Sequence, residues 1–265
     1  MKHVWQKAIL LALTVLCFAV PAWAAGLTVK SSSVKEDVVN VAVPYIAGSR
    51  GGEKTDLAVN RELFATVDRQ LEALLKPEDL AAFRASHTQG DSLSSLLAYQ
   101  KALVQFTSEQ VARANSEVKT AASWYVRSEY EIKSASPRYL SYIQKTTTYL
   151  GGAHDNVVWT AGNYDLATGK AVTLAELFVP DGNYQNRLST LISWQQAGLT
   201  RLKAYRTGRT PAPVRAVSVT GTEQFFVDKE RNLGIFYNPG EIAPMSEGVV
   251  LYNLSLNDFA DLIRL

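Results

Sequence analysis

The chain has very little cysteine. Among its 265 residues there is one, Cys17, and it lies in an N-terminal segment that we expect to be removed. A protein without cysteine forms no disulfide bond, no thiolate zinc site, no iron–sulfur cluster and no cysteine nucleophile. Its stability must then come from a hydrophobic core, and a chain of about 240 residues is long enough to bury one.

Net charge is also nearly absent. The chain has 27 basic residues, Lys and Arg, and 25 acidic residues, Asp and Glu. Two of the lysines, Lys2 and Lys7, belong to the N-terminal segment, so the remainder carries 25 residues of each sign. A neutral chain presents no broad positive surface to a phosphate backbone, and we therefore predict no nucleic-acid partner.

A long apolar run occurs only near the N-terminus. Lys2 and Lys7 precede the apolar run Ala8–Val20, and Ala22-Trp23-Ala24 is typical of a signal-peptidase site. The run is shorter than the roughly 20 residues needed to span a bilayer. We therefore predict that residues 1–24 are a signal peptide. The protein is expected to be exported to the periplasm or cell surface, with no integral membrane segment after cleavage.

The common catalytic and metal-binding motifs are missing. The sequence contains no Gly-x-Ser-x-Gly, no His-x3-His, no His-Glu-x-x-His and no acidic calcium loop. Only two histidines, His87 and His154, follow the predicted signal peptide. The sequence predicts no catalytic residues, no metal site and no cofactor.

Hydrophobic periodicity predicts alternating groups of helices and strands. Apolar residues at three- and four-residue steps predict helices over 56–75, 78–85, 93–117, 184–205 and 256–263. Alternating or β-branched runs predict strands over 38–46, 123–133, 139–150, 157–164, 225–227, 233–237 and 249–254. The strands between 123 and 164 should form an antiparallel meander with one face buried and one exposed.

These elements predict an α+β class, with antiparallel sheets, helices packed on one side, and two small lobes. Residues 25–36 are expected to be a flexible tail. An N-terminal lobe should cover residues 37–165, with a helical insertion at about 77–117, and a C-terminal lobe should cover residues 166–265.

Two segments carry most of the specific information. Tyr149–Phe178 begins with an aromatic residue and a glycine pair, and continues with His154-Asp155, a β-rich run, a Thr-Gly-Lys turn and a Leu-x-x-Leu-Phe step. Phe225–Pro244 combines two short strands with the proline-rich loop Tyr-Asn-Pro-Gly-Glu-Ile-Ala-Pro. Most of the glycines and prolines here serve backbone geometry.

Together the two segments resemble paired extracytoplasmic domains of unknown function in bacterial surface proteins. That family includes RsiV-type lysozyme-sensing anti-sigma factors and the non-catalytic N-terminal part of PdaC-type peptidoglycan deacetylases. The resemblance implies a binding role rather than catalysis, because in the deacetylases the chemistry belongs to a separate domain. It also implies that the helical segment 77–117 is an insertion where this protein could differ in partner.

The same two segments supply the candidate binding residues: Tyr149, Gly151, Gly152, His154, Tyr237, Asn238 and Glu241. His154 and Glu241 could form two walls of one groove. The simpler structural interpretation is that His154 bonds backbone groups in a turn, while Glu241 accepts backbone N–H groups within its loop and Ile242 anchors that loop. Outward-facing tyrosines of the meander could add a recognition surface, or could serve as cross-strand packing pairs.

The expected function is that of an exported, monomeric, non-catalytic binding module of the bacterial cell envelope. Its expected partner is a cell-wall glycan or an extracytoplasmic, wall-directed protein such as lysozyme. The alternative is a small hydrolase or metal-dependent enzyme that acts on wall polymers through His154 with Asp165 or Glu241.

Overall fold

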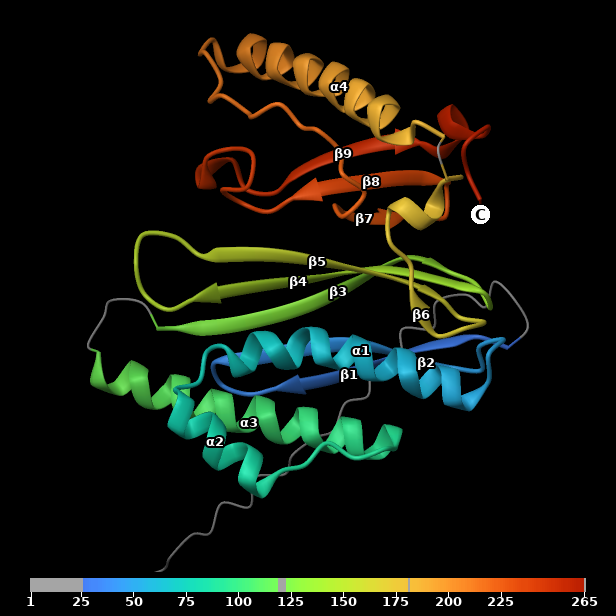
Figure 1. Ribbon diagram of the computed structural model, residues 1–265. Coiled ribbons are helices and arrows are strands. Elements are labelled where there is room, and N and C mark those ends of the chain that lie inside the picture. The colour runs from blue at the N-terminus through green and yellow to red at the C-terminus, as the bar shows by residue number, and fades with distance from the viewer. Residues whose placement is uncertain (1–25, 119–122, 181, 265) are drawn as a thin grey trace, which may run out of the picture.

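A six-stranded sheet and a three-stranded sheet lie face to face in the computed structural model, and helices cover the outer face of each (Figure 1). The structure describes residues 26–118, 123–180 and 182–264. The predicted signal peptide, residues 1–24, lies outside the described residues. The predicted α+β class is confirmed, and each sheet has its helices on one side.

The larger sheet is built by the N-terminal lobe and by one two-residue strand, Lys170–Ala171, which lies beyond the lobe boundary predicted at residue 165. Its strands follow one another across the sheet in chain order. They are β1 (Thr28–Lys35), β2 (Val39–Ala47), β3 (Tyr125–Ala135), β4 (Tyr139–Tyr149), β5 (Asn156–Asp165) and β6 (Lys170–Ala171). The predicted meander is confirmed as β3, β4 and β5, which pair antiparallel over almost their full lengths.

One pairing departs from the predicted antiparallel sheets. β2 and β3 run parallel, over residues 39–41 and 126–128. Parallel neighbours cannot be joined by a tight turn and need a long crossover connection. Three helices supply it, namely α1 (Glu53–Glu72), α2 (Pro77–Ser86) and α3 (Leu93–Glu117), and they cover one face of the sheet.

The prediction of a flexible tail over residues 25–36 is wrong for β1, which pairs with β2 along all eight of its residues. Its sequence, TVKSSSVK, has three consecutive serines and two lysines, a composition that does not favour a strand. Pairing with the buried β2 outweighs this weak intrinsic preference.

The helical segment 77–117 is part of the N-terminal core. It buries five large apolar side chains in that core: Phe83, Leu96, Leu103, Val104 and Val111. They pack with residues of α1 such as Leu63, Phe64 and Val67, whose three- and four-residue spacing places them on one helix face. Removing this segment would therefore open the core.

The C-terminal lobe has its own core. Its sheet contains β7 (Gln224–Val227), β8 (Asn232–Tyr237) and β9 (Val250–Ser255), and α4 (Tyr184–Thr207) covers the outer face. Three short 3-10 turns complete it: η1 (Ala175–Leu177), η2 (Met245–Glu247) and η3 (Leu256–Phe259). The last of these replaces the helix predicted over 256–263. The core changes from the first lobe to the second between Leu166 and Leu174.

A small apolar cluster holds the two sheets together. Ile143 of β4 packs against Phe226 of β7 and Phe236 of β8. Two hydrogen bonds reinforce this contact: the Val227 backbone N–H donates to Ser141 Oγ at 3.0 Å, and Asn163 Nδ2 donates to the Phe225 carbonyl oxygen at 2.7 Å. The C-terminal lobe thus covers one end of the meander.

Candidate functional site

The other end of the same sheet face is only partly covered: Trp159 packs edge-on against Phe236 of β8, with the ring centroids 5.6 Å apart, and the residues beyond it are not buried. Side chains alternate between the two faces of a sheet along each strand. Tyr125, Arg127 and every second residue after them in β3, with their cross-strand partners in β4 and β5, therefore point toward the C-terminal lobe. Ser141, Ile143 and Asn163 are buried beneath it. Toward the opposite end of β3, β4 and β5, the same face has eight half-buried or exposed residues. We call them the open sheet face: Tyr125, Arg127, Glu129, Lys145, Thr147, Tyr149, Val157 and Trp159.

A stacked aromatic pair stands at the edge of this face. Tyr125 and Tyr149 are cross-strand partners whose ring centroids lie 6.0 Å apart at an interplanar angle of 28°. The Arg127 guanidinium lies over the Tyr125 ring, 4.9 Å from its centroid, a cation–π distance. Tyr125 Oη donates to Asp155 Oδ2 at 2.9 Å, and this bond raises the pKa of Tyr125 above its ordinary value.

A second cation–aromatic contact lies nearer the C-terminal lobe, where Lys145 of β4 and Trp159 of β5 are cross-strand partners. Lys145 Nζ is 4.7 Å from the centroid of the Trp159 ring. It also donates to Glu131 Oε2 at 2.7 Å, while Lys133 donates to the other oxygen at 2.6 Å. Burial alone would raise the pKa of Glu131, but the two ammonium groups outweigh burial and hold that pKa below its usual range. The open sheet face is therefore both aromatic and charged.

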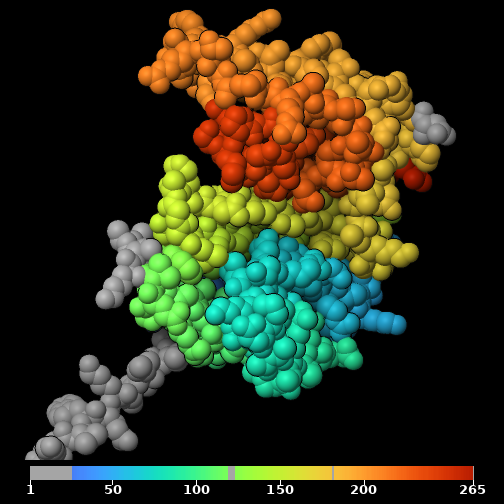
Figure 2. Space-filling model, turned by 60° about the vertical axis from the view of Figure 1, so that its left-hand side comes forward, coloured from blue at the N-terminus to red at the C-terminus, as the bar shows by residue number. Residues whose placement is uncertain are grey.

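The hairpin between β4 and β5 projects beside the C-terminal lobe and borders the open sheet face (Figure 2). Its glycines, Gly151 and Gly152, have φ angles of 88° and 109°, which L-residues rarely adopt. A side chain at Gly151 would also approach Trp124 Nε1 to 3.1 Å. Tyr149 Oη donates to the Gly152 carbonyl oxygen at 3.2 Å. These contacts fix the shape of the hairpin.

His154 lies at the exposed tip of this hairpin. The backbone hydrogen bonds that the sequence suggested for its ring are not formed with any described residue. Its neighbour Asp155 is held by Tyr125 instead. The hairpin therefore places His154 at the rim of the open sheet face.

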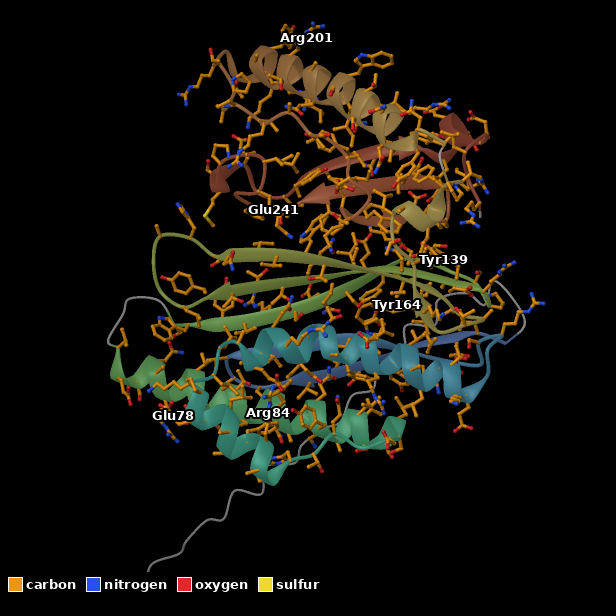
Figure 3. All side chains as sticks on the ribbon, viewed as in Figure 1. Glu78, Arg84, Tyr139, Tyr164, Arg201 and Glu241 are labelled. Carbon is orange, nitrogen blue, oxygen red and sulfur yellow. The ribbon has the colours of Figure 1, made fainter. Side chains whose placement is uncertain are left out.

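The loop after β8 approaches the same face from the other lobe (Figure 3). The backbone N–H of Asn238 donates to Glu241 Oε2 at 2.7 Å, and the N–H of Glu241 donates to the Asn238 carbonyl at 3.1 Å. Ile242 is buried in the C-terminal core. The structural roles predicted for Glu241 and Ile242 are both confirmed.

Asn238 attaches this loop to β5. Its Oδ1 accepts the Trp159 N–H at 2.8 Å, and its Nδ2 donates to the Trp159 carbonyl at 3.0 Å. In contrast, Tyr237 belongs to the opposite face of β8, where it packs edge-on against Tyr252 in the C-terminal core. Burial raises the pKa of Tyr237. Of the predicted binding residues, Tyr237 alone is turned away from the others.

The groups proposed for catalysis are not brought together. Asp165 lies at the far end of β5, paired with Tyr139, whereas His154 precedes the near end. Ten residues of strand correspond to roughly 30 Å. The Glu241 carboxylate is engaged by the Asn238 backbone. Among the described residues, His, Cys, Asp and Glu form no group of three or more that could hold a metal ion.

The sequence interpretation missed six of the eight members of the open sheet face, among them Arg127, Lys145 and Trp159. Alternation along β3 places Arg127 on the polar face, but many exposed strands have such residues. The signal that distinguishes this end of the sheet is the absence of a covering lobe, and that depends on contacts between residues far apart in the chain.

Tyrosines of the meander were predicted to be either a recognition surface or packing pairs. Tyr142 is fully buried toward the helices, and Tyr139 lies beneath the C-terminal lobe, where its Oη donates to Asn163 Oδ1 at 2.9 Å. Tyr125 and Tyr149 form a packing pair that also faces outward. Packing roles are therefore confirmed for these tyrosines, whereas recognition by Tyr125 and Tyr149 stays a prediction.

None of the described helices combines the length and the hydrophobicity needed to cross a bilayer. No curated protein matches the chain. Residues 175–254 match a family described as a protein of unknown function, DUF3298. The matched segment runs from η1 into β9 and includes α4 and the loop that carries Asn238 and Glu241.

Two solved structures share the fold. A DUF3298 family protein from Bacteroides fragilis superposes with a TM-score of 0.56 at 18% sequence identity, over 91% of this chain and 95% of that one. A DUF3298 family protein from Pseudomonas aeruginosa gives a TM-score of 0.50 at 12% identity, over 90% and 94%. These findings confirm the resemblance to a domain family of unknown function, whereas kinship with RsiV-type or PdaC-type proteins stays a prediction. The chain thus carries a DUF3298 match in its C-terminal lobe and shares its overall fold with solved members of that family.

Proposed function

We propose that the protein is an exported, non-catalytic binding module of the bacterial cell envelope, acting as a monomer, and that the open sheet face is its recognition surface. The observation that carries the proposal is the stacked Tyr125–Tyr149 pair with Arg127 above it. Aromatic and arginine side chains on a rigid scaffold are the groups that most often supply binding energy at recognition surfaces.

A cell-wall glycan is the ligand class that this face fits best. The half-buried rings of Tyr125 and Tyr149 offer flat apolar surfaces on which sugar rings can stack, whereas the Trp159 ring is already contacted by Phe236 and Lys145. Arg127 and Lys145 lie next to them and can donate to the carboxylates and amide carbonyls of a peptidoglycan strand. The resemblance to envelope proteins supports the same ligand class.

A wall-directed protein such as lysozyme is the second candidate, and one observation favours it. Leu150 of the hairpin and Met245 of η2 are exposed, by 38% and 64%, on the two loops that border the open sheet face. Exposed apolar residues around a centre that contains aromatic and arginine side chains are typical of protein interfaces.

The hydrolase alternative receives less support. A general base needs a carboxylate or hydroxyl within hydrogen-bond reach, and His154 contacts neither Asp165 nor Glu241. We therefore propose binding without bond cleavage.

Retention on insoluble peptidoglycan and on immobilised lysozyme tests the proposal. The double variant Tyr125→Ala/Arg127→Ala should be retained at least tenfold less than the unchanged protein on whichever matrix binds. The matched control, Tyr205→Ala/Arg113→Ala, removes one exposed tyrosine and one exposed arginine elsewhere and should be retained normally. Equal retention of both variants, or failure of the unchanged protein to bind either matrix, would reject the proposed function.

A further inference from the structure

The outermost helix, α4, belongs to a segment with a strongly one-sided charge. Between Gly182 and Thr222 there is no Asp or Glu, while six residues are basic: Arg187, Arg201, Lys203, Arg206, Arg209 and Arg215. This contrasts with the nearly neutral chain as a whole. A local excess of this size creates a positive surface potential even on a neutral protein.

The same helix exposes large apolar side chains. Trp194 and Tyr205 are 68% and 88% exposed, and Leu199 and Leu202 are 48% and 44% exposed. Only Leu188 and Ile192, near its N-terminus, are buried. The reason is geometric, because α4 inclines away from the three-stranded sheet toward its C-terminal end (Figure 1).

Three of these four exposed residues share one side of the helix with Leu191, which is half-buried and packs against the C-terminal core; Leu199 lies about 60° outside that side. At about 100° per residue, Leu191, Trp194, Leu202 and Tyr205 fall within an arc of about 80°, and Arg201 lies about 20° outside it. We call these five residues the α4 outer stripe. Arg206 borders the stripe on its other side, so basic groups flank the apolar residues.

Several of the basic groups are not neutralised by partners. Arg187 pairs with Asp261 and Lys203 pairs with Glu247. Arg201, Arg206 and Arg209 form no salt bridge with any residue that the structure describes, and Arg201 lies at the outer limit of the molecule (Figure 3). Their charge is available to an external anionic partner.

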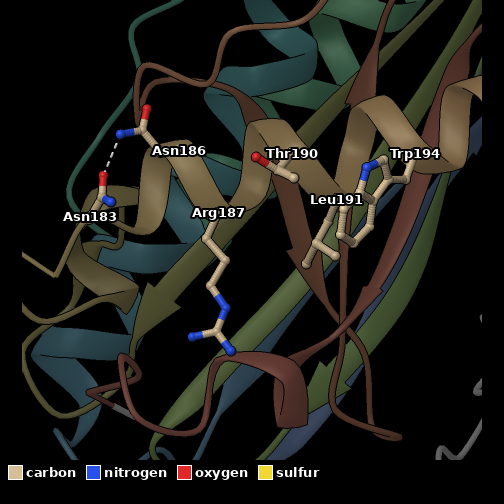
Figure 4. A pocket seen from close by; sticks show the side chains of 6 residues that line it. All are labelled: Asn183, Asn186, Arg187, Thr190, Leu191 and Trp194. Atoms are coloured by element: carbon tan, nitrogen blue, oxygen red, sulfur yellow. Dashed lines mark hydrogen bonds between the residues drawn. The ribbon is translucent and has the colours of Figure 1, made fainter.

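A shallow depression adjoins the N-terminal end of the stripe (Figure 4). Its volume is about 360 Å³, and it is lined by Asn183, Asn186, Arg187, Thr190, Leu191 and Trp194. Its walls combine hydrogen-bond donors, one guanidinium group and the Trp194 side chain. This combination suits a small polar group attached to an apolar body.

We propose that the α4 outer stripe binds the surface of a lipid bilayer that contains anionic headgroups. Helices that lie in a bilayer interface combine Trp, Leu and aromatic residues on one side with Lys and Arg beside them, as this helix does. Tryptophan and tyrosine rings settle at the headgroup level, and arginine side chains reach back from apolar positions toward phosphates.

Charge and shape favour this partner over the others. An anionic protein or polysaccharide would be attracted by the arginines, but neither requires leucine and tryptophan to be exposed together along one continuous helix side. A second copy of the chain would bring its own positive stripe against this one, which electrostatic repulsion disfavours. The proposal is independent of the open sheet face, which lies on the other side of the C-terminal lobe.

Vesicle flotation tests the proposal. The purified protein is mixed with vesicles of phosphatidylcholine alone or with one third phosphatidylglycerol, at low and at high salt. We expect flotation with the anionic vesicles, and we expect salt to weaken it. Each basic residue near an anionic surface contributes about fivefold to partitioning, so Arg201→Gln/Arg206→Gln/Arg209→Gln should lower partitioning on the order of 100-fold.

Two further variants complete the test. Trp194→Ser/Leu202→Ser/Tyr205→Ser changes only exposed residues and should lower partitioning at least tenfold with the charge unchanged. The matched control, Lys76→Gln/Arg113→Gln/Lys229→Gln, removes three exposed positive charges elsewhere and should bind like the unchanged protein. The proposal is overturned if the unchanged protein stays with the unbound fraction, if the control loses binding equally, or if the helix variants bind normally. Binding to acidic polysaccharide without binding to vesicles, or self-association lost in the stripe variants, also overturns it.

Discussion

Asn238 binds Trp159 as a neighbouring strand would. Its side-chain amide accepts the Trp159 N–H at 2.8 Å and donates to the Trp159 carbonyl at 3.0 Å. Asn60 of α1 does the same for Ile46 of β2, at 2.7 and 2.9 Å. In both cases a primary amide satisfies the donor and the acceptor of a strand residue that has no strand on that side. The second lobe is therefore attached to the first partly through a single side chain.

We expect Asn238→Ala to lower the free energy of unfolding by about 2 kcal/mol, because two hydrogen bonds are lost and the backbone groups of Trp159 are left without partners. Denaturant unfolding measures this. Asn253→Ala is the matched control, because the Asn253 side chain is exposed on β9, and it should change stability by less than about 0.5 kcal/mol. If both variants unfold at the same denaturant concentration, the attachment has no energetic role.

Gly162 is required by the ring of Tyr142. The two residues are cross-strand partners, and a Cβ atom at position 162 would lie 2.1 Å from Tyr142 Cε1. Tyr142 is fully buried and cannot move aside. Gly162→Ala should therefore destabilise the protein by about 3 kcal/mol. A variant with native stability, measured by thermal unfolding, would show that this part of the core rearranges freely.

Gly198 should behave in the opposite way. It lies inside α4, and a Cβ atom there would meet nothing within 4 Å. Glycine inside a helix is less favourable than alanine by about 1 kcal/mol. Gly198→Ala should accordingly stabilise the protein by about that amount in the same unfolding assay. Destabilisation would mean that α4 depends on the flexibility of this residue.

Asp68 should make stability depend on pH. Burial raises the pKa of Asp68 from 3.8 to about 7. The negative charge of Glu72 also raises this pKa, and the positive charge of Arg69 offsets part of the increase. Both carboxylate oxygens are buried without a hydrogen bond to the described residues. Between pH 4 and pH 7 the folded chain holds a proton on Asp68 that the unfolded chain has released. The free energy of unfolding should therefore fall as pH rises through this range, and level off above it.

The change attributable to Asp68 is on the order of 4 kcal/mol, from about 1.4 kcal/mol per pKa unit. Urea unfolding at pH 5 and pH 8 measures it by comparing the unchanged protein with Asp68→Asn. The variant should lose most of the difference between the two pH values and gain stability at pH 8. Asp258→Asn, at an exposed position, should leave the difference unchanged. An identical pH dependence in the Asp68 variant would contradict this assignment.

Strong periodicity in the sequence was enough to predict the long elements. The helix predicted over 93–117 has those bounds in the structure, because apolar residues such as Leu96, Leu103 and Val111 recur along one face. The meander was predicted for a similar reason, since β-branched and aromatic residues are concentrated in its strands. In these segments local preference and tertiary packing agree.

Elements that depend on distant contacts were not predicted. β1 has a polar sequence and exists because β2 pairs with it, and the parallel pairing of β2 with β3 depends on the helical crossover. Alternation assigns Arg127 to a polar face but does not show that the C-terminal lobe leaves it uncovered. That result depends on contacts such as Ser141 with Val227, 86 residues apart. The site was therefore only partly predictable, through Tyr149, the hairpin and Asn238.

Calorimetric titration with soluble peptidoglycan fragments and with lysozyme, followed by mass spectrometry of the recovered ligand, tests the central claim most directly. Our account predicts saturable binding of one of these ligands, loss of that binding in Tyr125→Ala/Arg127→Ala, and recovery of the ligand with its mass unchanged. Shortened glycan or deacetylated products that disappear in a His154→Ala variant would show that the protein is an enzyme and would contradict the account.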